Sequence, residues 1–168
     1  MDETQFRQRI MPLHKRLFAY ALSILGDESD AADCLQEAFT RLWEHRSRMD
    51  GIDNVEAYAV VTVRNIAVNI ASRNRFASPA NPDHPPEIID PQPSPGDNLE
   101  QREQLRTVAL LLRELPENQR KVIMLSAVSG LSNTQIRQAT GFSDDNVRVL
   151  LSRGRKKLRE LFSRNTHS

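Results

Sequence analysis

The sequence contains little of what stabilises a secreted or membrane-spanning protein. Its 168 residues include one cysteine, Cys34, so no disulfide can form within the chain. No apolar stretch approaches the roughly 20 residues that a membrane-spanning helix needs. The N-terminal stretch is acidic before any apolar run begins, unlike a signal peptide. These absences predict a cytoplasmic protein that makes no contact with a membrane.

Residues typical of catalytic or metal sites are also scarce. The histidines are scattered, and none lies at metal-ligand spacing from Cys34. The sequence has no glycine-rich phosphate loop and no nucleophile motif. We therefore expect no enzyme activity, no catalytic residue, no metal, no cofactor and no small-molecule substrate.

The composition favours small helical domains. Aromatic residues make up 5% and apolar residues 39% of the chain, which would hardly stabilise one large β-rich domain. Apolar residues recur at helical spacing along most of the chain, and no alternating strand pattern bounded by turns is present. The predicted fold class is all-α.

Proline is concentrated in one segment, with seven of the nine prolines between Pro79 and Pro95. Proline lacks a backbone donor and disfavours helix in the residue before it, so regular structure cannot persist there. The composition is typical of a semi-extended tether, with a long surface loop as the alternative. We favour a linker over residues 77–98, between a first domain at 1–76 and a second at 99–168.

The first domain is predicted to hold three helices, which begin near Phe6, Ser29 and Asp53. Pro12 lies inside the first pattern, so that helix starts after it or bends there. Ser29 is the expected N-cap of the second helix. Asp53 has capping-box spacing to Glu56 at the start of the third.

The second domain is predicted to hold four helices, separated at Pro116, Gly130 and Gly141. A capping box opens the third of them at Ser132, and Ser143 caps the last. The final two helices have the order of a helix-turn-helix motif, whose second helix enters a DNA groove.

The last helix is the strongest candidate for a binding site. Residues 100–168 hold thirteen basic and seven acidic residues, whereas the first domain is near neutral. Arg148 and Arg153 can each donate two hydrogen bonds to guanine, and Val149 can contact a thymine methyl. The basic side chains further along suit phosphates. Ordinary solvated side chains remain the alternative for these cations.

Two helices of the first domain carry weaker signals. The third contains Asn65, Asn69 and Asn74, although Asn is a poor helix former. Their amides can bond to the edges of unpaired bases, or can cap and fray the helix end. The second exposes acidic and amide side chains beside Phe39 and Trp43. Docking on a basic protein helix and an ordinary amphipathic helix explain that face equally well.

Taken in order, these segments resemble bacterial sigma factors of RNA polymerase. DAADCLQEAFTRLWEHR resembles the segment that grips the β′ clamp helices. NVEAYAVVTVRNIAVNIASRNR resembles the helix that reads and opens the minus-ten element. The stretch from LPENQRKVIMLSAVSGLS to LLSRGRKKLREL is similar to the domain that reads the minus-thirty-five element. Two helical domains and a short linker resemble the extracytoplasmic-function (ECF) subgroup.

The resemblance, combined with the basic residues of the third and last helices, predicts three sets of site residues. The polymerase-docking set comprises Asp33, Gln36, Glu37, Phe39, Leu42 and Trp43. The minus-ten set comprises Asp50, Asn54, Arg64, Asn65, Asn69 and Arg73, and the loop 47–54 corresponds to the one that captures a flipped-out base. The minus-thirty-five set comprises Arg148, Val149, Ser152, Arg153, Arg155 and Lys156.

Three positions depart from the family pattern. Tyr58 stands where many members have Trp, which keeps an aromatic in the core. Arg137 replaces an alanine usually packed between the two helices of the motif, so its side chain must extend outward or spread the helices. Asp144 and Asp145 stabilise the start of the last helix but repel phosphates, which favours selectivity over general affinity.

The leading hypothesis is a sigma factor that performs no chemistry. It would bind core RNA polymerase, through the β′ clamp helices and the β flap, and promoter DNA. An inhibitory anti-sigma factor fits the resemblance, although no residue identifies one. The alternatives are a free-standing helix-turn-helix regulator that binds duplex DNA as a dimer, and a protein-interaction adaptor whose basic helices are merely surface.

Overall fold

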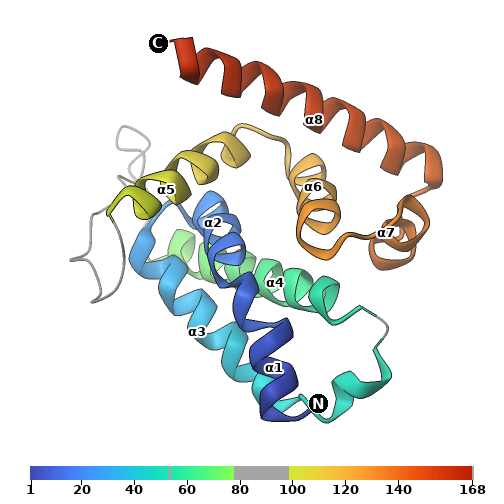
Figure 1. Cartoon of the computed structure of the whole chain (residues 1–168). Coiled ribbons are helices and arrows are strands. Elements are labelled where there is room, and N and C mark those ends of the chain that lie inside the picture. The colour runs from blue at the N-terminus through green and yellow to red at the C-terminus, as the bar shows by residue number, and fades with distance from the viewer. Residues whose placement is uncertain (53, 78–98, 168) are drawn as a thin grey trace.

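The computed structural model describes residues 1–52, 54–77 and 99–167, and every regular element in these ranges is a helix (Figure 1). The α-helices are α1 (Glu3–Arg9), α2 (His14–Leu25), α3 (Glu28–Glu44), α4 (Val55–Ala77), α5 (Leu99–Arg113), α6 (Glu117–Ser129), α7 (Asn133–Thr140) and α8 (Asp144–His167). Two short 3₁₀ helices, η1 (Met11–Leu13) and η2 (Arg48–Gly51), connect them. The predicted all-α class is confirmed. Residues 78–98 of the predicted linker lie outside the described residues.

Pro12 divides the first predicted helix in two. The α-helical pattern stops at Ile10, and η1 carries the chain through Pro12 before α2 begins. Proline has no N–H to continue the helical ladder, and its ring crowds the preceding turn. The first part of the chain therefore has four α-helices instead of the three predicted.

The start of α3 differs from the prediction by two residues. The Asp27 carboxylate accepts hydrogen bonds from the backbone N–H groups of Ser29, at 2.7 Å, and Asp30, at 3.2 Å. The prediction that Ser29 caps this helix is wrong, because the stronger acceptor lies two residues earlier. At the start of α4, the Asn54 side chain accepts from Ala57 N–H at 2.7 Å. The capping box predicted for Asp53 lies outside the described residues.

The helix boundaries of the second half follow the prediction closely. Gly130 and Gly141 end α6 and α7 with φ of 64° and 80°, the left-handed conformation that glycine adopts at little cost. Ser132 and Gln135 form the capping box of α7. Ser143 Oγ accepts from Asn146 N–H at 3.1 Å and so caps α8.

The two predicted domains pack on each other through one continuous hydrophobic core. Helix α5, part of the predicted second domain, packs mainly on α2, and α6 packs on α4. Figure 1 shows α5 and α6 lying between the first four helices and α8, which packs on α6. Buried Leu17 and Tyr20 of α2 belong to the same cluster as Leu112 of α5 and Leu115, which lies in the turn after α5.

Ion pairs cross this interface as well. Glu28, at 2% exposure, accepts hydrogen bonds from Arg102 Nη2 at 2.9 Å and from Arg106 Nε, both on α5. A carboxylate is buried only where such partners compensate for lost hydration. Glu28 therefore fixes the start of α3 to α5.

Candidate functional site

The exposed face of α8 brings together four residues of the minus-thirty-five set. Val147 and Leu151 are buried and hold α8 against the core. Gly154 allows a close approach, since a Cβ there would lie 3.0 Å from Ile123 Cγ1 of α6. The side chains that point away from this packed face are Arg148, Val149, Ser152 and Arg153, and all are exposed. They form a continuous surface of one helix.

Of the four cations on or next to that surface, one has a competing partner among the described residues. Arg148 and Arg153 make no ion pair with any residue in the described part of the chain. Lys156 is likewise exposed, whereas Arg155 Nη2 donates to Ser126 Oγ of α6 at 3.1 Å. Arg148, Arg153 and Lys156 are therefore available to phosphates or bases in this arrangement, and Arg155 is engaged.

Arg137 extends outward and leaves the helix-turn-helix packing intact. Its Nε lies 3.3 Å from Asp144 Oδ1, and its side chain is 45% exposed. Ile136 and Val147, on the two helices of the motif, stay fully buried. The ion pair partly neutralises Asp144, so that Asp145 is the remaining free carboxylate at the start of α8.

The minus-ten set is divided between free and engaged residues. Asn65, Asn69 and Arg73 are exposed, and their spacing of four places them along one face of α4. Asn65 Oδ1 accepts a hydrogen bond from Arg64 Nη1 at 3.2 Å. Arg64 is only half-exposed, because its Nη2 forms an ion pair with Glu117 of α6. This hydrogen bond also lowers the pKa of the Glu117 carboxyl.

The loop that precedes α4 is also engaged. Asn54 Nδ2 donates to Ser129 O, at the end of α6, over 3.4 Å. Asp50 Oδ1 lies 2.5 Å from the N-terminal ammonium of Met1. Neither side chain is free to meet a base in this arrangement. Asp53 of the same loop lies outside the residues that the structure describes.

Tyr58 is not part of the core. Its side chain is 39% exposed, whereas Val55, Ala59 and Val63 take up the inward face of α4. One helical step of about 100° separates Tyr58 from Ala59, which turns the ring toward solvent. The prediction of a buried aromatic at this position is therefore wrong.

The polymerase-docking set forms a polar surface above fixed aromatic rings. Asp33 and Gln36 are exposed, and Glu37 pairs with Arg41 at 2.6 Å. Phe39 stacks on His14, with ring centroids 5.6 Å apart. Leu42 is 1% exposed, so it supports this face from the core and cannot touch a partner as predicted.

Trp43 lies at the edge of the same face and is held from both sides. Phe6 of α1 meets it edge-on at 5.2 Å, and the Arg46 guanidinium lies 3.9 Å above its ring. These packing partners were missed because nothing in the pattern of α3 indicates which residues of α1 and α2 lie beside it.

The described part of the chain contains neither a cluster of metal-ligand side chains nor a membrane-spanning helix. Within residues 1–52, 54–77 and 99–167, no group of three His, Cys, Asp or Glu side chains could hold a metal ion. No helix in those ranges is both long and apolar enough to cross a bilayer.

Comparison with protein families matches both halves of the chain. The model for sigma-70 region 2 matches residues 10–76, and the model for sigma-70 region 4 matches residues 105–158. A probable RNA polymerase sigma factor, RfaY of Xanthomonas campestris pv. campestris, is 31% identical over 150 residues, covering 87% of this chain. The chain spans only 38% of that relative.

Two further proteins match along nearly their whole length. The ECF RNA polymerase sigma factor SigF of Caulobacter vibrioides is 27% identical, covering 97% of this chain and 88% of that protein. The fold is similar to that of the sigma factor RpoE of Bartonella quintana, solved with the anti-sigma factor NepR. That similarity has a TM-score of 0.67 and 22% identity, and it covers 95% of this chain and 98% of the other.

Proposed function

The chain belongs to the sigma-70 family of bacterial RNA polymerase sigma factors, within its ECF group, and on this premise we propose that it directs core RNA polymerase to promoters. The observation that carries the proposal is the order of the two family regions, followed by a free cationic face on α8. It acts in the cytoplasm by binding alone, and the polymerase supplies the chemistry.

We assign the first role to α8, which reads the minus-thirty-five element in the major groove. Arg148 and Arg153 point away from the core and are free to donate to guanine, while Val149 can meet a thymine methyl. Lys156 lies further along the helix, where phosphate contacts set the register. Asp145 repels phosphates at the helix start, which penalises poorly aligned DNA.

The second role falls to α4, which contacts the minus-ten element. Asn65, Asn69 and Arg73 line one exposed face, and amides can bond to the edges of unpaired bases. Arg64 can join them only if its ion pair with Glu117 opens. We therefore infer that polymerase binding separates α6 from α4, which also frees Asn54 from Ser129. On this view residues 1–76 and 99–168 act as two domains, and residues 77–98 link them.

Docking on polymerase uses the acidic face of α3. Asp33, Gln36 and Glu37 present carboxylate and amide groups beside the rings of Phe39 and Trp43. Charge of one sign steers association with a basic partner surface, such as the clamp helices that the family binds. The β flap is the partner that we assign to the second domain.

An anti-sigma factor is a further expected partner. The similar Bartonella protein was solved in complex with one. A pull-down from the source bacterium with the purified chain would identify such a partner.

Run-off transcription tests the proposal. Purified chain plus core polymerase should start transcripts at a defined set of promoters on genomic DNA, and core polymerase alone should not.

Asp33→Arg should weaken core binding by about tenfold, because it reverses an exposed charge at the docking face. Glu114→Arg, an equal reversal at an exposed position in the turn after α5, is the control. Tight binding to a palindrome without polymerase would instead indicate a dimeric regulator.

A further inference from the structure

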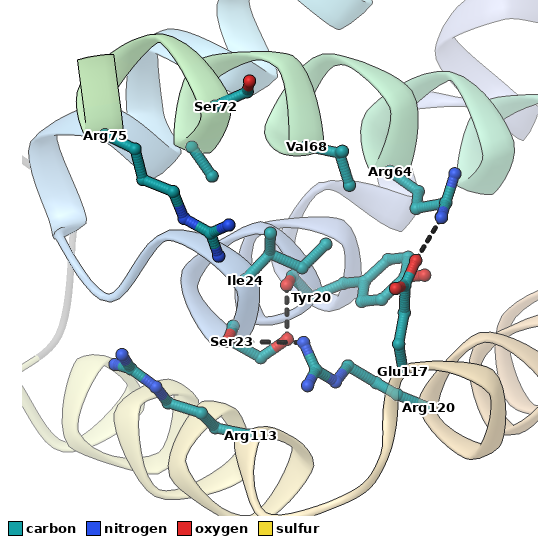
Figure 2. Close-up of a pocket in the computed structure, with 11 residues that line it drawn as sticks. Tyr20, Ser23, Ile24, Arg64, Val68, Ser72, Arg75, Arg113, Glu117 and Arg120 are labelled. Carbon is teal, nitrogen blue, oxygen red and sulfur yellow. Dashed lines mark hydrogen bonds and ion pairs between the residues drawn. The ribbon is translucent and has the colours of Figure 1, made fainter. Parts of the chain in front are cut away.

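A pocket of about 570 Å³ lies among α2, α4, α5 and α6 (Figure 2). Four arginines line it, namely Arg64 and Arg75 from α4, Arg113 from α5 and Arg120 from α6. Glu117 is the one acidic side chain in the lining. The volume lies within the range typical of small-molecule sites. The packing of α5 and α6 on the first helices is what brings these charges together.

The positive charge of the pocket is only partly compensated. Glu117 is committed to Arg64. Arg120 donates to backbone carbonyls instead, to Leu115 O at 3.1 Å and to Ser23 O at 3.5 Å. Among the described residues, no carboxylate lies within ion-pair distance of Arg75, Arg113 or Arg120. Three guanidinium groups thus share one recess whose one carboxylate, Glu117, is paired with Arg64 instead.

Arg120 is partly buried, whereas Arg75 and Arg113 are exposed at the mouth of the pocket. Desolvation is the largest influence on Arg120 and lowers its pKa; Arg113 acts in the same direction, whereas Tyr20 and Glu117 act in the opposite one. The Nε atoms of Arg64 and Arg120 are buried and have no hydrogen-bond acceptor among the described residues. Buried donors and charges normally have partners, and unpaired ones indicate a missing acceptor.

Arg113 is held in place by its contact with the end of α2. A Cβ added at Gly26 would lie 2.5 Å from Arg113 Nη1, so the guanidinium packs directly on this glycine. Figure 2 shows Arg75 reaching into the recess from α4 while Arg113 extends from α5 on the facing side. The two charges therefore approach one space from different parts of the chain.

We propose that this pocket binds a small anion with two or more phosphate groups, of the class of pyrophosphate or the polyphosphate of a nucleotide. Arg75, Arg113 and Arg120 supply the charge, and planar guanidinium groups match phosphate oxygens in pairs. A multivalent anion is favoured over chloride because three positive groups surround the space. The phosphates of a nucleic-acid strand are the other source of the same chemistry.

Such a ligand would tie α4 to α5 and α6. A ligand that binds only the packed arrangement stabilises it in proportion to its concentration. Its effect on transcription rests on the proposed function: it would hold Glu117 on Arg64 and so oppose promoter opening. Binding itself does not depend on that function.

Isothermal titration of the full chain with inorganic pyrophosphate, at constant ionic strength, tests the site directly. We expect saturable binding, with the dissociation constant rising roughly tenfold for each guanidinium lost in Arg113→Gln and Arg75→Gln/Arg113→Gln. Arg16→Gln, which removes an exposed charge from α2 outside the pocket, should change it less than twofold. Circular dichroism establishes that each variant is folded.

Three results would overturn the proposal. The first is pyrophosphate binding that survives in the Arg75→Gln/Arg113→Gln variant, and the second is an equal loss in Arg16→Gln. The third is binding of a short single-stranded oligonucleotide that requires these arginines while pyrophosphate does not bind. Run-off transcription that fails while pyrophosphate still binds would count against the sigma-factor role and leave the site in place.

Discussion

At the scale of single residues, Arg137 shows how a charge in an unfavourable position is accommodated. Its place in the helix-turn-helix motif suggested that it must either extend outward or spread the helices. It extends outward and pairs with Asp144, 3.3 Å away. One ion pair thereby resolves two departures from the family pattern, the bulky cation on α7 and one of the two acids on α8.

Arg148→Ala should reduce promoter selectivity more than affinity. A lost bidentate contact to guanine costs roughly 1–3 kcal/mol of discrimination against the wrong base. Measuring run-off transcription from promoters altered one base pair at a time would locate that base. Lys156→Ala should instead weaken binding to every sequence alike and lower the salt dependence by about one ion. Equal weakening on all promoters in Arg148→Ala would contradict its assignment to a base.

Cys34 should be inert at neutral pH in the native protein. It is buried, and burial raises the pKa of its thiol to about 12, so the reactive thiolate is scarce below that pH. Labelling with a thiol reagent at pH 8 should be slow in buffer and fast in guanidinium chloride. Fast labelling of the folded chain would show that α3 opens readily from α4, since Cys34 Sγ lies 3.6 Å from Val63 O.

At the scale of elements, local signals set most helix boundaries. Ser132, Gly130 and Gly141 act through hydrogen bonds and backbone angles within a few residues, so their roles could be predicted from sequence. The sequence alone does not identify the N-cap of α3, because Asp27 and Ser29 are both good cap residues. Burial of Leu42 and exposure of Tyr58 depend on how neighbouring helices are oriented, which helical periodicity indicates only coarsely.

The cap assignment at α3 can be tested with two substitutions. Asp27→Ala should lower the free energy of unfolding by about 1 kcal/mol, since it leaves two backbone donors without their acceptor. Ser29→Ala should change it by less than about 0.5 kcal/mol, as for an ordinary surface position. Urea denaturation followed by circular dichroism measures both. A larger loss in Ser29→Ala would restore the serine as the cap.

At the scale of the whole molecule, the packing of α5 and α6 on the first helices decides which functional residues are free. The face of α8 is unobstructed, whereas Arg64 and Asn54 are held by α6 and its C-terminal end. Both contacts join residues more than 50 positions apart in sequence. Such contacts leave no local pattern, which is why Arg64 could be predicted as a DNA contact but its engagement could not.

Glu28→Gln should loosen the whole packed arrangement. Removing one member of a buried charged cluster costs about 3 kcal/mol, because the remaining charges stay poorly hydrated. Thermal unfolding should shift downward, and amide exchange should accelerate in α5 more than in α3. Glu103→Gln, an exposed position on α5, is the matched control. Unchanged exchange in α5 would mean that apolar packing alone holds this helix.

The Glu28 cluster also has a consequence for synthesis of the chain. Arg102 and Arg106 lie 74 and 78 residues after Glu28 in the sequence. The ribosome therefore synthesises Glu28 before either of its ion-pair partners. At typical rates of elongation this interval lasts roughly 4 to 15 seconds. During that time the nascent α2–α4 bundle must keep this carboxylate hydrated. The nascent first half therefore differs from the finished one at the surface where α5 docks, which stays exposed until that helix has been synthesised.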